Sequence, residues 1–316
     1  HSLEFLEGDL KKNMGASGRP VILLHHFGFD EEHSLSWWPD EWRTTYHDLI
    51  KGCDVIAILH GHAHKPLIYL WEGIDVYHPP HFRGDPKKNE PVTHGFFVFH
   101  LTDDELTVAE RKLDGTWGMT ARKPLRAPTP AAAALPRDVT FISTSDSHYR
   151  EPDHRLGHHN DLNRASLEEM NRIAGTAWPD KLGGETIAAP RGVVVLGDLI
   201  DDGDRGTAER RISAEQYKLF QADFGLDGTD GLLKYPVFEG WGNHDGPPEG
   251  KEKCGFSSQG QIRQRNQLRK QKGLISNLSD NGLHYSWDWD DVHFVQLNLY
   301  PADKQREGVQ YSPVWH

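Results

Sequence analysis

Five short apolar runs in this chain each end in polar residues that can bind metals, and this pattern constrains the fold more than any other feature. The runs are rich in leucine and β-branched residues, which is typical of buried strands. They are "PVILLHHF", "CDVIAILHGHAH", "VTFISTSDSH", "GVVVLGDLIDD" and "YPVFEGWGNHD". Helical patterns such as "TAERRISAEQYKLFQADFG" lie between some of them. This alternation predicts a layered α/β core with functional loops at the strand ends.

Composition excludes some classes of function. The chain of 316 residues has a formal net charge of -12, which argues against the clustered Lys and Arg of a nucleic-acid-binding surface. No apolar run approaches the roughly 20 residues of a transmembrane helix, so we expect no membrane span. The two cysteines, Cys53 and Cys254, leave a single disulfide and two free thiols both open.

Composition also divides the chain into three segments. Residues 1–119 and 138–316 contain the strand and helix patterns, whereas residues 120–137 are rich in Ala and Pro and lack periodicity. The middle segment therefore predicts a linker. Its "APTPAAAALPRD" resembles the beginning of a mature secreted chain, which favours an exported parent protein.

The polar residues at the strand ends form a set of oxygen and imidazole donors. Each short motif alone is weak, because Asp-x-His and paired histidines are common in loops. Together they suit borderline divalent metals, which favour mixed imidazole and carboxylate ligands. Two metals about 3.5 to 4 Å apart also need a bridging carboxylate and ligands from both sides. The donors are Asp146, His148, Asp198, Asn243, His244, His25, His26, His62 and His64.

The blocks "DSH", "GDLIDD", "GNHD", "HH" and "GHAH" resemble the five signature blocks of the calcineurin-like binuclear metallophosphoesterases, across most of the chain. The resemblance implies a four-layer αββα sandwich of two mixed sheets packed face to face. It also implies two divalent or trivalent metal ions, such as Fe, Mn or Zn. One metal would be held by Asp146, His148 and His64, the other by Asn243, His25 and His62, and both by Asp198.

The resemblance implies further roles around this centre. In the pair of histidines the family places its ligand on the first, so His25 is expected and His26 is the fallback. His244 would be the general acid, and Asp201 would support the centre from behind the ligands.

The blocks occur in a rotated order. In the family the Asp-x-His block comes first and Gly-His-x-His last, whereas here His25, His62 and His64 precede Asp146. Joining the end "VQYSPVWH" to the start "HSLEFLEG" restores the family order. We interpret the chain as one circularly permuted domain, with residues 1–119 as its C-terminal part and residues 138–316 as its N-terminal part. A fusion of two incomplete halves is less favoured, because neither half holds a full metal set.

The resemblance implies hydrolysis of a small-molecule phosphoester by a hydroxide that bridges the metals and attacks phosphorus in line. Arg150 and Tyr149 follow the Asp-x-His block and are expected to bind substrate, since arginine suits bidentate phosphate contacts. Asp202 stands where the protein Ser/Thr phosphatase branch has Arg, which favours a phosphomonoesterase or phosphodiesterase. The alternatives are a phosphoprotein phosphatase, a binuclear hydrolase of another ester or amide, and a binding module with a vestigial metal site.

Overall fold

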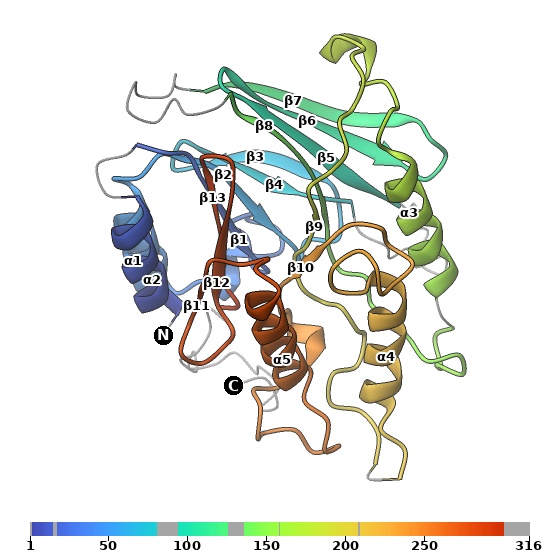
Figure 1. Ribbon diagram of the computed structural model, residues 1–316. Coiled ribbons are helices and arrows are strands. Elements are labelled where there is room, and N and C mark those ends of the chain that lie inside the picture. Colours follow the sequence, from blue (N-terminus) through green and yellow to red (C-terminus); the bar gives the residue numbers. More distant parts are fainter. Residues whose placement is uncertain are drawn as a thin grey trace.

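The computed structural model describes residues 2–14, 18–80, 94–125, 136–157, 159–207 and 209–299. Within these ranges the chain is an α/β protein with two mixed sheets and five α-helices (Figure 1). This confirms the predicted class and the two mixed sheets. No helix among the described residues is both long and apolar enough to cross a membrane. Cys53 and Cys254 are free thiols.

The first sheet has seven strands in the order β11-β12-β13-β1-β2-β4-β3. Strands β13, β1, β2 and β4 run parallel, and the others pair antiparallel. The strand bounds are β1 Val21–His25, β2 Val55–His60, β3 Leu67–Trp71, β4 Ile74–His78, β11 Asn277–Leu278, β12 Tyr285–Trp289 and β13 Val292–Gln296.

The second sheet has six strands in the order β10-β9-β8-β5-β6-β7, with β8, β9 and β10 parallel. The strand bounds are β5 Gly95–Thr102, β6 Glu105–Lys112, β7 Trp117–Pro124, β8 Asp138–Thr144, β9 Val193–Val195 and β10 Val237–Glu239. The expected start of the linker at residue 120 is wrong, because residues 120–124 belong to β7 and pair with β6. Residues 126–135, the Ala- and Pro-rich part, lie outside the described residues.

Three hydrophobic clusters pack the sheets and the helices of Figure 1 against one another. One joins α1 and α2 to the first sheet, for example through Leu6 and Leu23. The second contains side chains of both sheets, such as Leu24 and Phe99, and the third joins the second sheet to α3 and α4. This arrangement agrees with the predicted sandwich. The α-helices are α1 Ser2–Asn13, α2 Asp40–Ile50, α3 Asn160–Arg172, α4 Ile212–Phe224 and α5 Ser258–Gln271, and short 3-10 helices span Leu35–Trp37, Asp180–Leu182 and Asn243–Asp245.

Both sheets contain strands from each side of residues 126–135. In the first sheet β1 pairs with β13, and in the second β5 pairs with β8. We therefore expect the two chain segments to unfold in a single cooperative transition. A ligand that binds only the native state adds RT ln(1 + [L]/Kd) to stability, so chelation should lower that transition as a whole. Calorimetry with and without chelator, and after metal is restored, measures this. Two separate transitions, only one of which moves, would contradict it.

Candidate metal centre

The candidate centre lies where parallel strands of both sheets end. His26 directly follows β1, His62 and His64 follow β2, and the other donors follow β8, β9 and β10. Backbone hydrogen bonds hold these loops against one another. The Gly61 N–H donates to the His26 carbonyl at 2.9 Å, and the Asp146 N–H donates to the Gly197 carbonyl at 3.0 Å. Loops from distant parts of the sequence therefore converge at one edge of the fold.

Four side chains form a first ligand group, with ligand atoms that all lie within 4.8 Å of one another. These are His64, Asp146, His148 and Asp198. His64 Nε2 is 3.3 Å from Asp146 Oδ1, and His148 Nε2 is 3.6 Å from Asp198 Oδ2. Two ligands each about 2.1 Å from one tetrahedral metal are about 3.4 Å apart, so these separations fit a shared ion. His148 Nε2 and Asp198 Oδ2 are also buried without a hydrogen-bond partner in the described part of the chain.

His26, His62 and Asp198 form a second group. His26 Nε2 is 3.4 Å from Asp198 Oδ2, and the Asn243 amide oxygen is 3.1 Å from His26 Nε2 and 3.0 Å from His62 Nδ1. Asp198 belongs to both groups. It is the residue that the family resemblance implies as the bridge between two metals. Burial lowers the pKa of His26, but the Asp198 carboxylate outweighs it and raises that pKa to about 10. A proton and a metal would therefore compete for His26, and metal binding would release the proton.

The expectation for His25 requires correction. Its ring is fully buried and contacts Phe29, Trp38 and Tyr46, and it belongs to neither ligand group. Side chains alternate between the two faces of a strand, so His25 shares the helix-covered face of β1 with Leu23. The next residue, His26, points to the opposite side, toward Asp198. Burial lowers the pKa of His25 to about 3, so it is a neutral packing residue.

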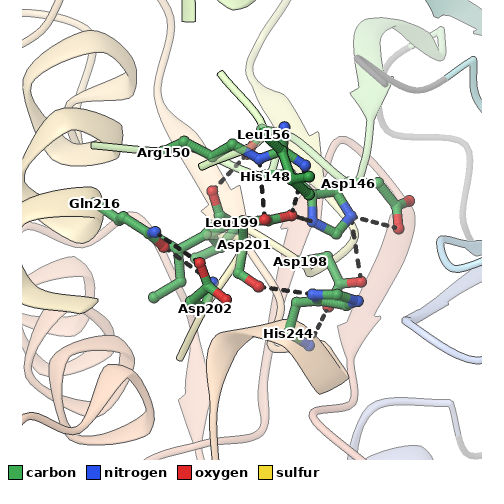
Figure 2. A network of polar contacts seen from close by, with 12 residues as sticks. Asp146, His148, Arg150, Leu156, Asp198, Leu199, Asp201, Asp202, Gln216 and His244 are labelled. Atoms are coloured by element: carbon green, nitrogen blue, oxygen red, sulfur yellow. Dashed lines mark hydrogen bonds and ion pairs between the residues drawn. The ribbon is translucent and has the colours of Figure 1, made fainter. Parts of the chain in front are cut away.

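The expected substrate contacts of Tyr149 and Arg150 are also not supported by the geometry. Tyr149 is fully buried in the hydrophobic cluster under α4, and its hydroxyl donates to Asp223 Oδ2 at 2.9 Å. Arg150 is 2% exposed, and its guanidinium donates to both oxygens of Asp201. Figure 2 shows this Arg150 fork facing Asp201. Both side chains are therefore committed to partners inside the protein.

Asp201 contacts the candidate ligand His148 and orients its ring. Its Oδ1 accepts a hydrogen bond from His148 Nδ1 at 3.0 Å, which leaves Nε2 facing Asp146 and Asp198 (Figure 2). Burial raises the pKa of Asp201, but His148 and Arg150 outweigh it and hold that pKa well below its usual value. Burial and the nearby His244 lower the pKa of His148 to about 4. A neutral imidazole held by a carboxylate is the usual state of a histidine ligand.

His244 is half-buried beside His148, with ring centroids 4.6 Å apart. Its backbone N–H donates to Asp198 Oδ1 at 2.8 Å, and its Nδ1 is 2.7 Å from the Asp201 carbonyl. Since a carbonyl only accepts, Nδ1 carries the hydrogen. Asp245 fixes this loop by accepting the N–H groups of Leu199 and Gly242.

The backbone at the centre is strained. Seven non-glycine residues in the described ranges have positive φ, and five of them are candidate ligands. Each such conformation costs on the order of 1 to 3 kcal/mol and persists only where the surroundings enforce it. The values are 73° for His62, 56° for His64, 54° for Asp146, 40° for His148 and 51° for Asp198. The strain is therefore concentrated on the candidate ligands.

Sequence reasoning missed a pair, the buried His60 and the half-buried Tyr69, that supports two ligand loops. His60 Nδ1 donates to the Gly61 carbonyl at 2.7 Å, so Nε2 accepts from the Tyr69 hydroxyl at 3.0 Å. The Tyr69 oxygen in turn accepts the Phe29 N–H at 2.9 Å. The pair thus connects the loop of His62 and His64 to the loop of His26. The only sign of this pair in the sequence is His60, which directly precedes "GHAH".

Tyr69→Phe tests this support. It leaves the Phe29 N–H and His60 Nε2 without their partner, so we expect a loss of about 1 to 3 kcal/mol of stability. Because two ligand loops lose their connection, metal affinity should fall about tenfold, the lower end of the range for outer partners of a metal site. Calorimetric metal titration measures this. Tyr235→Phe, a change in another half-buried tyrosine, is the matched control. Unchanged metal affinity in Tyr69→Phe would contradict the supporting role.

Comparisons of the chain with protein-family models, with curated proteins and with solved structures found no match. The geometry of the buried His and Asp groups therefore carries the functional argument.

Proposed function

We propose that this chain is a metal-dependent hydrolase of small-molecule phosphoesters with a binuclear centre, arranged as in the calcineurin-like metallophosphoesterases and circularly permuted. The single observation that carries the proposal is the position of Asp198. Its carboxylate lies in both ligand groups, between His148 on one side and His26 on the other. A buried carboxylate shared by two sets of imidazoles is the arrangement that a two-metal site requires.

The residues fit this chemistry by charge as well as by position. Burial opposes ionisation of Asp146, but a hydrogen bond and the charge of His64 outweigh it, so the pKa of Asp146 lies well below its usual value. Oxygen and imidazole donors suit Zn, Mn and Fe. When bound, such ions supply positive charge for the phosphoryl oxygens and activate water as the nucleophile. A chain with a net charge of -12 would thereby bind an anion.

His244 would provide the proton for the leaving group. Its Nδ1–H is held by the Asp201 carbonyl, so Nε2 is the ring atom that remains for transfer. The backbone N–H of His244 also donates to Asp198. This hydrogen bond holds His244, the proposed general acid, next to the proposed bridging residue. This geometry supports protonation of an oxygen that leaves from a phosphoryl group at the centre.

Two observations bear on the alternatives. Asp202, which replaces the arginine of the protein phosphatase branch, forms contacts with His154 at 2.9 Å and Arg205 at 2.8 Å. It therefore belongs to an internal network, which supports a small-molecule substrate over a phosphoprotein. All the ligand types of a complete centre are present, which disfavours a vestigial site. Hydrolysis of a non-phosphate ester or amide remains the second candidate, since the same centre would activate water for either reaction.

The test is metal analysis followed by a substrate panel. Metal-loaded protein should hydrolyse phosphomonoesters or phosphodiesters, and chelation should abolish this activity until metal is restored. The panel includes carboxylic esters and amides with the same leaving groups. Faster hydrolysis of those than of every phosphoester would overturn the proposal.

A further inference from the structure

The imidazole of His293 in β13 lies between two carboxylates, away from the candidate centre. Its Nε2 is 2.6 Å from Asp9 Oδ2 in α1, and its Nδ1 is 2.7 Å from Asp288 Oδ1 in β12. The side chains of His293 and Asp9 are fully buried. An ionised carboxylate can only accept a hydrogen bond, whereas a neutral imidazole has a single N–H. The ring therefore makes both contacts at once only when it is protonated.

The two carboxylates have different surroundings. Asp9 also accepts hydrogen bonds from the Asn277 amide at 2.6 Å and from the Ser286 hydroxyl at 2.7 Å, so it is held inside the protein. The side chain of Asp288 is 37% exposed, and it pairs with Arg19, in the segment before β1, at 2.7 Å. Asp288 therefore has a second charged partner and access to water, whereas Asp9 depends on buried donors.

The electrostatics agree with a protonated ring. Burial lowers the pKa of His293, but its contacts with Asp288 and Asp9 outweigh burial and raise that pKa above its ordinary value of 6.5. Burial raises the pKa of each carboxyl group, but His293 helps to lower both below the ordinary value. On the β1 side, the residue that pairs with His293 is the uncharged Val21. The proton on the ring thus depends on the two carboxylates.

These contacts connect elements that are far apart in the sequence. Asp9 and His293 are separated by 284 residues, and they join α1 to the hairpin of β12 and β13. The same helix packs on the sheet through apolar side chains, such as Leu6 and Leu10 against Val295. The charged contacts therefore add a link that responds to pH to an interface that is otherwise apolar.

We propose that His293 forms a pH-dependent link between α1 and the β12–β13 hairpin, which is closed when the ring is protonated and opens as the pH rises. Once the proton is lost, a ring lone pair faces one of the carboxylates, so one contact must break. Asp288 is the partner that is released, because Arg19 and water stabilise its charge. Asp9 keeps the remaining N–H at Nε2. The link therefore opens on the hairpin side.

The sign of the pH dependence follows from linkage. A histidine whose pKa is higher in the folded chain than in the unfolded chain stabilises the fold fully below about pH 6.5, and this stabilisation is lost as the pH rises through the folded-state pKa. Between these two values His293 raises the unfolding equilibrium constant by up to about tenfold per pH unit. Asp9 and Asp288 do not titrate in this range, because their pKa values lie below the ordinary 3.8.

Asp288→Asn tests the link at a position where the fold should tolerate the change. An opposite charge in close contact shifts a pKa by about 1 to 3 units, so the titration midpoint of His293, followed by NMR, should fall by about one pH unit or more. The wild-type protein should unfold less readily than the variant near pH 6, and this advantage in the unfolding constant should shrink by about tenfold by about pH 10. Denaturant unfolding at a series of pH values, with both proteins in the same metal state, measures this.

Asp280→Asn is the matched control, because it changes an exposed aspartate between β11 and β12 and should alter neither quantity. The His293 signal is the one that is absent from His293→Gln, and correlations from backbone to ring assign it if that variant does not fold. A wild-type midpoint at or below 6.5 would overturn the inference. So would a midpoint that Asp288→Asn does not move, or a wild-type advantage that stays constant with pH.

Discussion

Asp198→Ala should lose bound metal and activity together, by more than the 10- to 100-fold that loss of an outer partner typically costs. Asp198 Oδ2 is 3.4 Å from His26 Nε2 and 3.6 Å from His148 Nε2, so its removal takes a ligand from both groups at once. It also leaves the buried His26 without the carboxylate that raises its pKa. Elemental analysis of the purified variant measures the metal, and a phosphoester assay measures the activity.

Two further variants sharpen this experiment. Asp198→Asn keeps the oxygen that accepts the His244 N–H but removes the negative charge, so it should fold like the wild-type protein and still lose metal. Asp161→Ala changes an acidic residue that is 84% exposed on α3 and should retain full metal. Full metal content in both Asp198 variants would exclude the bridging role.

His244→Ala should slow hydrolysis of alkyl phosphoesters by up to about 10² to 10⁴-fold, and should slow nitrophenyl phosphoesters much less. An alkoxide needs a proton as its bond to phosphorus breaks, whereas nitrophenolate leaves with little assistance. The His244 ring is anchored by the Asp201 carbonyl and is absent from the two ligand groups around Asp198, so metal content should not change.

The two leaving groups control for each other in this experiment. A uniform loss on both, with metal retained, would mean that His244 acts by positioning or by charge. Loss of metal would instead place His244 among the ligands, beside His148 and Asp201, with which it forms a further close group.

The fold class and the convergence of the loops could be predicted because each strand is a local apolar run followed at once by polar residues. The choice between His25 and His26 also had a local signal. Ile22 and Leu24 face the other sheet while Val21 and Leu23 face the helices, so alternation alone assigns His25 to the helix side. We nevertheless expected His25, because the family places its ligand on the first histidine of the pair.

Other features had no local signal. Arg150 and Tyr149 find their partners Asp201 and Asp223 at separations of 51 and 74 residues, and nothing near them in the sequence announces those contacts. Residues 120–124 of β7 were assigned to the linker because β7 is an edge strand. Its residues 117–124 are half-buried or exposed, so they carry polar side chains without a strong apolar pattern.

The register of β1 has a consequence for how the chain is made. Leu24 pairs with Gln296, so the strand that leads to His26 gains one of its two neighbours only after 272 further residues have been synthesised. Such long separations slow folding. The nascent chain must therefore keep β1 and β2 from pairing with other strands until β13 has left the ribosome, and this stage is where we expect aggregation and dependence on chaperones.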